Sequence, residues 1–386
     1  MKNLFLNLAV SGVQGLSPYL PGKPIEELQR ELGIRDILKL ASNENPMGAS
    51  ETVVNALQQE SQEIALYPDG NGFILKQALA ETLKVRQEQI TLGNGSNDVL
   101  DMIARTFLCQ GREAIFSQYA FAVYPIATQA VGATMKISAA YPQEHHSMPY
   151  GHDLEAMLAL MSTETRVIFI ANPNNPTGTW LDRSALRHFM DQVAEGIVVV
   201  IDEAYFEYVD EVDYPDTLQW LDDYPNLIVT RTFSKIYGLA SLRVGYAVCS
   251  EAIADLLNRV RQPFNVNTFA LVAATTALAD TAHVTKCADL NREGLQFWRD
   301  ACLQRQLAFM PTVGNFITID MQQDAMPIYD ALLREGVIVR PVANYGLPNH
   351  LRITIGIKEQ NIRCLTALDK VLDNVLDKVS DKVLLG

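Results

Sequence analysis

Short apolar runs that end in polar or glycine-rich clusters recur through the first two thirds of the chain. They lie at residues 90–92, 113–116, 166–171, 197–201 and 227–230. The stretches between them space their apolar residues as helices do. Uniformly apolar strands that alternate with helices are typical of a parallel sheet covered by helices on both faces. Ligands bind such sheets beyond the carboxyl ends of the strands, where these polar clusters fall, so we expect one site at that edge.

The pattern changes after about residue 255. An alanine- and leucine-rich helical stretch at residues 268–279 leads to a smaller unit. Near the other end of the chain, the three prolines of residues 16–24 predict an extended arm, because proline interrupts helices. The apparent strands of the smaller unit lie at residues 316–320, 337–340 and 351–355.

Composition limits the classes of partner. Of 386 residues, 48% are hydrophobic, which is enough for two or more packed units. The formal net charge of -14 repels nucleic acids and anionic membranes, so we expect neither as a partner. No apolar run approaches the roughly 20 residues of a membrane span. An anionic ligand would therefore have to be held by a local cluster of cations and amides.

The cysteines and the N-terminus indicate a cytoplasmic protein. Five dispersed cysteines without a C-x-x-C pair are typical of reduced, packed thiols. Asn3 and Asn7 interrupt the apolar residues at the start of the chain, and no small-x-small cleavage site follows them. We therefore do not expect a secretory signal peptide.

Two residues at predicted strand ends suggest carbonyl chemistry. Lys235 follows an apolar strand, and Arg243 lies eight residues further on. A lysine in an apolar, cationic environment has a lowered pKa and can form a Schiff base, whereas the alternative is a solvated loop lysine. Asp202 follows five apolar residues and is suited to pair with a pyridinium nitrogen, with Tyr205 placed to reach a phenolic oxygen. The alternative for Asp202 is a helix cap or an ion pair.

Two loops are suited to hold a cofactor. The segment 172–178 contains two Asn-Pro steps and a closing glycine, which predict a rigid turn that aims the Asn175 amide. The glycine-containing loop 93–97 precedes a helix, whose free N–H groups and dipole suit a phosphate. It has neither the G-x-G-x-x-G of a dinucleotide site nor the lysine of a P-loop. A purely structural turn remains the alternative for each loop.

Taken together and in order, these segments resemble the fold-type I pyridoxal-phosphate-dependent aminotransferases, most closely the histidinol-phosphate aminotransferases. The resemblance covers nearly the whole chain. It implies an α/β fold with a three-layer large domain around a mostly parallel sheet, a smaller α+β C-terminal domain and an extended N-terminal arm. The implied bounds are 1–30 for the arm, 46–255 for the large cofactor-binding domain, and 31–45 with 256–386 for the small domain. The matching segments are residues 40–48, 67–72, 93–98, 172–178, 202–205, 232–243 and 351–356.

The resemblance assigns the cofactor site. Lys235 would carry pyridoxal 5'-phosphate as a Schiff base and move the proton, and Asp202 would pair with the ring nitrogen. Tyr205 and Asn175 would contact the phenolic oxygen. Phe121 would stack on the ring, with Tyr119 and Tyr124 as alternatives, because Ser117-Gln-Tyr replaces the prolines frequent in the family. The phosphate would be held by Ser96, Asn97, Thr232, Ser234 and Arg243.

The resemblance also assigns the substrate site. Arg340 and Arg352 would grip the substrate phosphate or carboxylate, beside Tyr19 and Asn175. Tyr67 would reach the cofactor phosphate or the substrate across a homodimer interface. The implied reaction, in histidine biosynthesis, converts L-histidinol phosphate and 2-oxoglutarate into imidazole-acetol phosphate and glutamate.

Alternatives on the same scaffold are an aromatic-amino-acid aminotransferase and a phosphothreonine-type decarboxylase. A non-catalytic regulator would need an appended basic DNA-binding segment, which the chain does not show. The cluster of His145, His146, His152 and nearby acids has no standard metal-ligand spacing, so we expect a solvated loop there and no metal.

Overall fold

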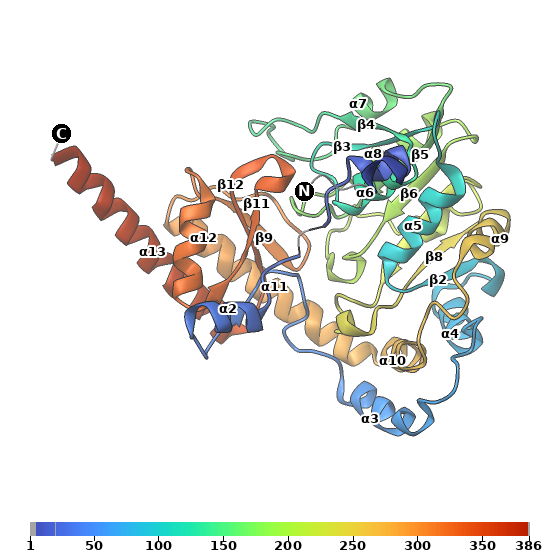
Figure 1. Cartoon of the computed structure of the whole chain (residues 1–386), viewed down its shortest axis with the longest axis horizontal. Helices are drawn as coiled ribbons and strands as arrows, with labels where there is room; N and C mark the ends of the chain where they lie inside the picture. The colour runs from blue at the N-terminus through green and yellow to red at the C-terminus, as the bar shows by residue number, and fades with distance from the viewer. Residues whose placement is uncertain (1–4, 20, 385–386) are drawn as a thin grey trace.

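The computed structural model describes residues 5–19 and 21–384, and its largest sheet lies in the middle of the chain. Within the described residues this sheet has seven strands in the order β2-β8-β7-β6-β5-β3-β4 (Figure 1). Strands β3 to β7 pair in parallel, whereas β8 is antiparallel to both β2 and β7. The strands are β2 (Ile90–Gly93), β3 (Glu113–Ser117), β4 (Thr134–Ser138), β5 (Thr165–Ala171), β6 (Val198–Asp202), β7 (Leu227–Thr232) and β8 (Gly245–Cys249).

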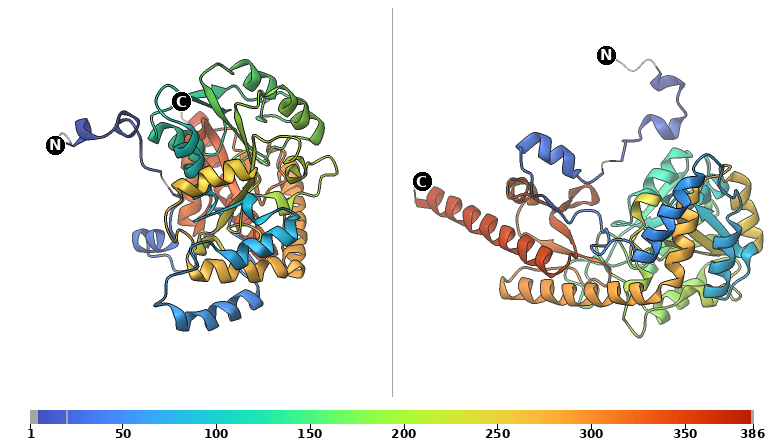
Figure 2. Two further views of the ribbon diagram at one scale, coloured as in Figure 1. Left: turned by 90° about the vertical axis from the view of Figure 1, so that its right-hand side faces the viewer. Right: turned by 90° about the horizontal axis from the view of Figure 1, so that it is seen from below.

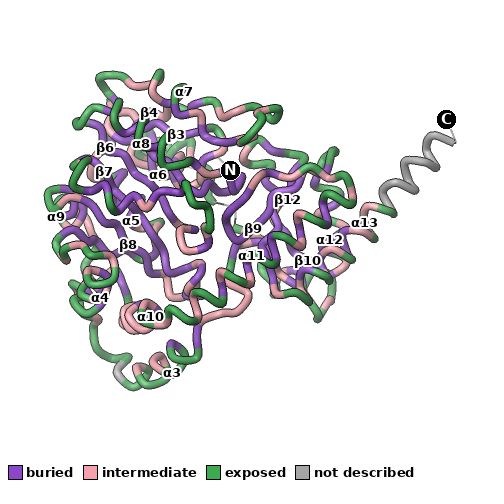
Figure 3. The backbone as a smooth tube through the Cα atoms, turned by 180° about the vertical axis from the view of Figure 1, so that it is seen from behind, coloured by how far each residue is buried: buried purple, intermediate pink, exposed green. Residues whose placement is uncertain are grey.

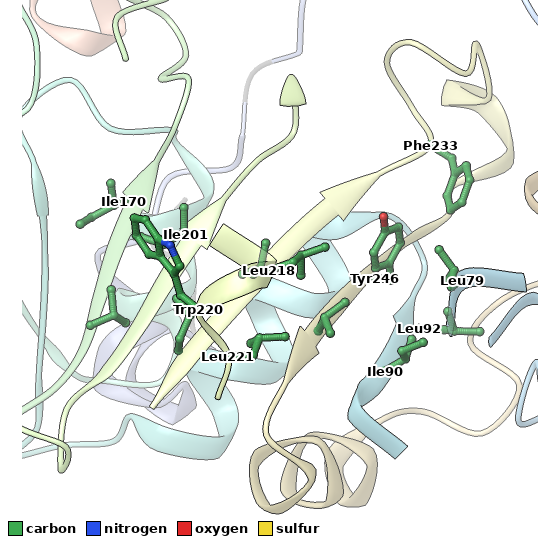
Figure 4. Close-up of a cluster of buried hydrophobic side chains, with 14 of the residues drawn as sticks. Leu79, Ile90, Leu92, Ile170, Ile201, Leu218, Trp220, Leu221, Phe233 and Tyr246 are labelled. Carbon is green, nitrogen blue, oxygen red and sulfur yellow. The ribbon is translucent and has the colours of Figure 1, made fainter. Parts of the chain in front are cut away.

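Helices cover both faces of this sheet, as the apolar strands predict. In β5, Ile168 and Ile170 face one apolar core, while Val167 and Phe169 face the other, because successive side chains of a strand point to opposite sides. Figure 4 shows the first core, and Figure 3 shows the strands buried beneath more exposed helices and loops. The covering helices are α3 (Glu51–Glu60), α4 (Phe73–Leu83), α5 (Ser96–Phe107), α6 (Val123–Ala130), α7 (Leu154–Ala159), α8 (Arg183–Gln192), α9 (Glu251–Val260) and α10 (Thr268–Ala279).

A second, smaller unit follows the long helix α11 (Thr281–Gln304), which runs from one unit to the other (Figure 1). Its antiparallel sheet has the order β11-β12-β9, and a short parallel pair joins β1 to β10. The predicted strand 337–340 is wrong in its extent: β10 ends at Ile338 and Arg340 begins β11, because the two pieces pair with different strands. The remaining elements are β1 (Leu38–Lys39), β9 (Phe316–Asp320), α12 (Ala325–Arg334), β10 (Val337–Ile338), β11 (Arg340–Val342), β12 (Leu347–Thr354) and α13 (Lys358–Leu384).

The N-terminal segment runs along the outside of both units (Figure 2). Residues 16–19 and 21–24 have no helix, as their prolines predict; Leu20 and residues 1–4, with Asn3, lie outside the described residues. Leu28 of α2 packs against Leu333 and Ile338 of the smaller unit. The N-terminal helices are η1 (Leu6–Leu8), α1 (Ser11–Gln14) and α2 (Ile25–Leu32), and further 3-10 turns are η2 (Ser61–Glu63), η3 (Gln87–Gln89), η4 (Phe206–Tyr208), η5 (Thr217–Trp220), η6 (Ala240–Leu242) and η7 (Ala343–Tyr345).

Two further expectations concern metals and membranes. Among residues 5–19 and 21–384, no three or more His, Cys, Asp or Glu side chains are grouped to hold a metal, and no helix is long and apolar enough to span a membrane.

The expectation of a solvated loop is wrong for His152, which is buried with its Nε2 2.9 Å from the Ala171 carbonyl oxygen. Asp153 caps α7 by accepting a hydrogen bond from the Ala156 N–H. Burial lowers the pKa of His152 to about 4, so this side chain packs as a neutral ring.

Candidate active site

One cavity lies at the carboxyl edge of the large sheet and is closed by residues of the smaller unit and the N-terminal segment. The cavity has a volume of about 200 Å³ and opens to solvent. Nearly all of the site residues predicted from the sequence line this cavity, although their positions span more than 300 residues of the chain. The predicted residues that line it are Tyr19, Ser96, Asn97, Phe121, Asn175, Asp202, Tyr205, Thr232, Ser234, Lys235, Arg243, Arg340 and Arg352.

Lys235 lies just beyond the end of β7, where the buried strand delivers it to the cavity. Its Nζ donates a hydrogen bond to the Ser42 carbonyl oxygen at 3.2 Å. Burial, followed by the nearby positive charge of Arg352, lowers the pKa of this amine to about 7. A substantial fraction of Lys235 is therefore a neutral nucleophile at neutral pH, which is the form that attacks a carbonyl.

This lowered pKa predicts how the cofactor-free protein captures an aldehyde. The neutral fraction of an amine with a pKa of about 7 rises roughly tenfold between pH 6 and pH 8 and then saturates. We expect the rate of capture of pyridoxal phosphate, followed by stopped-flow absorbance, to level off above pH 8. A rate that still climbs about tenfold per pH unit above pH 8 would indicate an ordinary lysine and contradict this assignment.

Asp202 ends β6 and is held by two hydroxyl groups. The Tyr124 hydroxyl donates to Oδ2 at 2.8 Å, and the Thr230 hydroxyl donates to Oδ1 at 2.9 Å. Burial raises the pKa of Asp202, and these two hydrogen bonds and Lys235 oppose that rise. The carboxyl group is thus fixed in orientation while it faces the cavity, as a partner for a ring nitrogen requires.

The three aromatic residues considered for stacking have different surroundings. Tyr124 lies with its ring stacked on Phe169 at 4.9 Å and its hydroxyl on Asp202, and Tyr119 packs edge-on against Tyr150. Phe121 lines the cavity. This placement favours Phe121 as the stacking residue, and it assigns Tyr124 a different position, beneath Asp202.

The loop before α5 forms a cradle beside Arg243. Gly95 precedes the helix with φ of 82°, a backbone conformation that favours glycine, and Arg243 Nη2 lies 2.4 Å from the place where a Cβ would stand. Gly95, the N-cap residue, has no side chain to cap the helix, and Ser96 and Asn97 of its first turn line the cavity. Arg243 adopts a left-handed φ of 56° and donates to the Ser234 hydroxyl at 3.1 Å. A helix N-terminus beside an arginine is suited to bind a phosphate.

Arg340 and Arg352 lie directly opposite each other on the antiparallel strands β11 and β12. Arg352 is only 6% exposed; it donates to the Asn175 side-chain oxygen and, at 2.7 Å, to the Ala41 carbonyl oxygen. Within the described part of the chain its buried Nε has no hydrogen-bond partner. Like charges opposite each other on a sheet destabilise it. A shared anion would relieve this repulsion, so the pair is suited to bind an anionic group.

Arg352 fixes the side chain of Asn175, the asparagine of the second Asn-Pro step. Because Asn175 Oδ1 accepts from Arg352, its Nδ2 is the group left to donate into the cavity. The turn is closed by Gly178, with φ of 79°, where a Cβ would lie 2.1 Å from the Thr312 hydroxyl. The sequence-based prediction of a rigid turn is confirmed in this respect, while the contact of Asn175 with a cofactor remains a prediction.

Tyr67 is the predicted site residue that does not line the cavity. Its side chain is 82% exposed and stacks on Phe264 with ring centroids 4.8 Å apart. A contact with the cavity of its own subunit is not seen, and a contact with that of a second subunit remains a prediction.

Comparison with known proteins agrees with this geometry. Residues 35–367 match the family described as aminotransferase class I and II. A relative named histidinol-phosphate aminotransferase 2 from Pseudomonas fluorescens (strain Pf0-1) is 55% identical over 374 residues, which are 96% of this chain and 99% of the relative. A relative of the same name from Pseudomonas aeruginosa is 56% identical over 370 residues, 95% of this chain and 98% of the relative. The chain belongs to the histidinol-phosphate aminotransferase family.

A solved structure supports the fold and the cofactor of this aminotransferase. The histidinol-phosphate aminotransferase of Sinorhizobium meliloti, in complex with pyridoxal-5'-phosphate, has a TM-score of 0.86 and 27% identity, and covers 95% of this chain and 98% of its own. The L-threonine-O-3-phosphate decarboxylase of Porphyromonas gingivalis shares the fold at 22% identity, with a TM-score of 0.75, and covers 87% of this chain and 100% of its own. The expected mostly parallel α/β fold of a fold-type I aminotransferase is confirmed.

The cavity fits pyridoxal 5'-phosphate, the cofactor of this aminotransferase. The cradle at Gly95 and Arg243 suits its phosphate, the buried Asp202 suits its ring nitrogen, and the partly neutral Lys235 suits its aldehyde. These groups line one cavity. When bound, the cofactor supplies an electron sink conjugated with the amino group of the substrate.

Sequence reasoning missed several residues of the aminotransferase site. Ser42 and Asn43 line the cavity from the segment after β1, and Tyr345 lines it from η7. Tyr124 was considered only for stacking, yet its hydroxyl holds Asp202. Ser42 and Asn43 lie inside the matching segment 40–48, so the signal existed, but a sequence pattern does not reveal which neighbour each contacts.

Proposed function

We propose that this aminotransferase converts L-histidinol phosphate and 2-oxoglutarate into imidazole-acetol phosphate and glutamate, as a step of histidine biosynthesis. The observation that carries this proposal is the pair Arg340 and Arg352, which lie opposite each other at the cavity that holds Lys235. A phosphate on one substrate and a carboxylate on the other are anions that this pair is suited to bind. The names of the relatives that are more than half identical agree with this substrate.

The side chains have distinct tasks in this proposal. Arg340, Arg352 and the arm residue Tyr19 bind the anionic end of the substrate and orient its Cα toward Lys235. Lys235 Nζ, partly neutral at neutral pH, removes the proton from that Cα and later returns a proton. Asp202 holds a negative charge beside the cofactor ring, and Tyr205 and Asn175 present hydrogen-bond donors to its phenolic oxygen. Phe121, Thr232, Ser234, Arg243, Ser96 and Asn97 hold the ring and phosphate in place.

Three candidate amino donors decide between this proposal and its alternatives. The cofactor-loaded protein is mixed separately with L-histidinol phosphate, L-phenylalanine and L-threonine phosphate. We expect histidinol phosphate to discharge the visible absorbance fastest, and added 2-oxoglutarate to restore it with formation of glutamate. Faster discharge by phenylalanine would favour an aromatic-amino-acid aminotransferase, and release of CO₂ from threonine phosphate would favour a decarboxylase.

The replacement Arg340→Ala tests the anion grip. We expect the KM for histidinol phosphate to rise about 10- to 150-fold, since a hydrogen-bonded charge pair contributes roughly 1.5–3 kcal/mol. The KM for phenylalanine, which has a carboxylate but no phosphate, should change less. Steady-state kinetics with both donors measure the difference, and equal losses for the two substrates would contradict a phosphate contact.

The protein is further proposed to act as a cytoplasmic homodimer. Large apolar side chains are exposed along residues 64–74, an amount that a monomer rarely shows in one stretch. A second copy that covers this surface would bring Tyr67 of the partner subunit toward the cavity. All five cysteines are free thiols and four are buried, which supports a reducing compartment. Sedimentation analysis measures the mass, and a monomer at micromolar concentration would contradict the dimer.

The division of the chain into units also stays a proposal. Residues 46–255 would form the cofactor-binding domain, residues 31–45 with 256–386 the small domain, and residues 1–30 the arm. The separate apolar cores of the large sheet and of the smaller unit support this division.

A further inference from the structure

Three consecutive residues after β1 each contact a different functional group of the active site. The Ala41 carbonyl oxygen accepts from Arg352 at 2.7 Å, and the Ser42 carbonyl oxygen accepts from Lys235 at 3.2 Å. The Asn43 side-chain Nδ2 donates to the Tyr205 hydroxyl oxygen at 2.8 Å. The first two contacts use the backbone, so the Asn43 contact is the one that depends on the residue type.

The hydrogen bonds of Thr354 define the orientation of the Asn43 amide. The Asn43 backbone N–H donates to the Thr354 hydroxyl oxygen at 2.9 Å, so the hydroxyl proton must point elsewhere. Asn43 Oδ1 lies 3.2 Å from the same hydroxyl and accepts that proton. The Asn43 carbonyl oxygen also accepts from Asn315, at 3.0 Å. With Oδ1 occupied on one side, Nδ2 faces Tyr205.

This orientation has a consequence for Tyr205. An amide nitrogen only donates, so the Tyr205 hydroxyl oxygen accepts from Asn43 and keeps its own proton for another acceptor. Asn43 and Tyr205 are 1% and 3% exposed, and Tyr205 lines the cavity. The direction open to the proton is therefore the cavity, where the cofactor binds.

We propose that Asn43 is a positioning residue that sets the direction of the Tyr205 hydrogen bond, so that Tyr205 donates its proton to the phenolic oxygen of the bound cofactor. The inference rests on the proposed contact of Tyr205 with that oxygen. A fixed donor stabilises the deprotonated oxygen, and the protonation midpoint of the bound cofactor is thereby held low. Burial raises the pKa of Tyr205 to about 12, so its proton is present throughout the working range.

Asn43→Asp reverses the hydrogen bond with almost no change of shape. Asparagine and aspartate both tolerate the left-handed φ of 55° found here. A carboxylate only accepts, so it would take the Tyr205 proton away from the cofactor. We expect the pH midpoint of the visible absorbance of the cofactor-loaded enzyme to rise by about one unit or more, because the deprotonated phenolic oxygen loses a hydrogen bond made to a charged group.

Asn43→Asp made in the Tyr205→Phe protein separates the effect of the reversed hydrogen bond from the effect of the added negative charge. The added negative charge acts in both backgrounds, whereas the reversed hydrogen bond needs the tyrosine hydroxyl. We expect the shift caused by Asn43→Asp to fall to less than half in the Tyr205→Phe protein. Equal shifts in the two backgrounds, or no shift in either, would overturn the proposal.

Asn43→Gly is a second variant that suits the same backbone conformation and removes the side-chain contacts. Without the Asn43 donor the Tyr205 hydroxyl is no longer fixed in direction, so we expect the midpoint to rise, but by less than in Asn43→Asp. An unchanged midpoint, or a fall that would show Asn43 to have been accepting the Tyr205 proton, overturns the proposal. A wild-type protein with no cofactor absorbance would instead refute the proposed function, and the inference with it.

Discussion

Lys235→Ala is expected to abolish both the visible absorbance of the bound cofactor and measurable transamination. Of the described residues that line the cavity, Lys235 alone carries an amine. Its removal takes away the nucleophile that binds the aldehyde and the group that moves the Cα proton. Loss of a positioned general base alone lowers the rate about 100- to 10,000-fold. Because the nucleophile is lost as well, we expect kcat to fall by more than about 1,000-fold.

The control for this variant is Lys235→Arg, which keeps a cation of similar length. Arginine stays charged and does not form the Schiff base, so we expect the same loss of absorbance with the positive charge retained. Circular dichroism and thermal unfolding check that both variants fold. Normal turnover by a folded Lys235→Ala protein would refute the scheme built on this residue.

The sheet was predicted best where burial is complete. Every residue of β6 and β7 is buried, and their apolar runs identified them in the sequence. The edge strand β4 was missed, because most of its residues are partly or fully exposed and its pattern is mixed. Strand β8 was missed because it begins two residues after Arg243, and no polar or glycine-rich cluster separates it clearly from the turn η6. Its partners are β2 and β7, and that pairing is a tertiary property.

The site was predicted from motifs, but its contacts were not. Lys235 and Ser42 are 193 positions apart, and Asn43 and Thr354 are 311 positions apart. Such contacts depend on how the smaller unit and the N-terminal segment fold onto the large sheet. Apolar periodicity determines which residues are buried, whereas the donor and acceptor facing each polar atom follow from the complete fold.

Two adjacent carboxylates at the end of β6 show how the strand alternation separates their tasks. Asp202 is paired in register with Thr230 and faces the cavity. Glu203 points the other way, is fully buried, and lies 2.7 Å from Arg231, which also bonds to Asp216. Glu203 is therefore committed to an internal ion pair, whereas the hydrogen-bond partners of Asp202 among the described residues are two hydroxyl groups, which leave its charge available to the cofactor.

Asp202→Asn should impair the chemistry with little loss of stability. The amide preserves the shape but loses the negative charge, and truncating one partner of a buried charge pair costs about 2–5 kcal/mol, or roughly 30- to 4,000-fold in kcat/KM. Because burial raises the pKa of Asp202, the neutral amide should not destabilise the fold greatly.

The matched variant Glu203→Gln should instead destabilise the fold and lower kcat/KM less. It removes the buried carboxylate that pairs with Arg231, which costs about 3–5 kcal/mol of unfolding free energy. Denaturant unfolding and steady-state kinetics on both proteins measure the contrast, and a larger kinetic loss for Glu203→Gln than for Asp202→Asn would contradict the assigned roles.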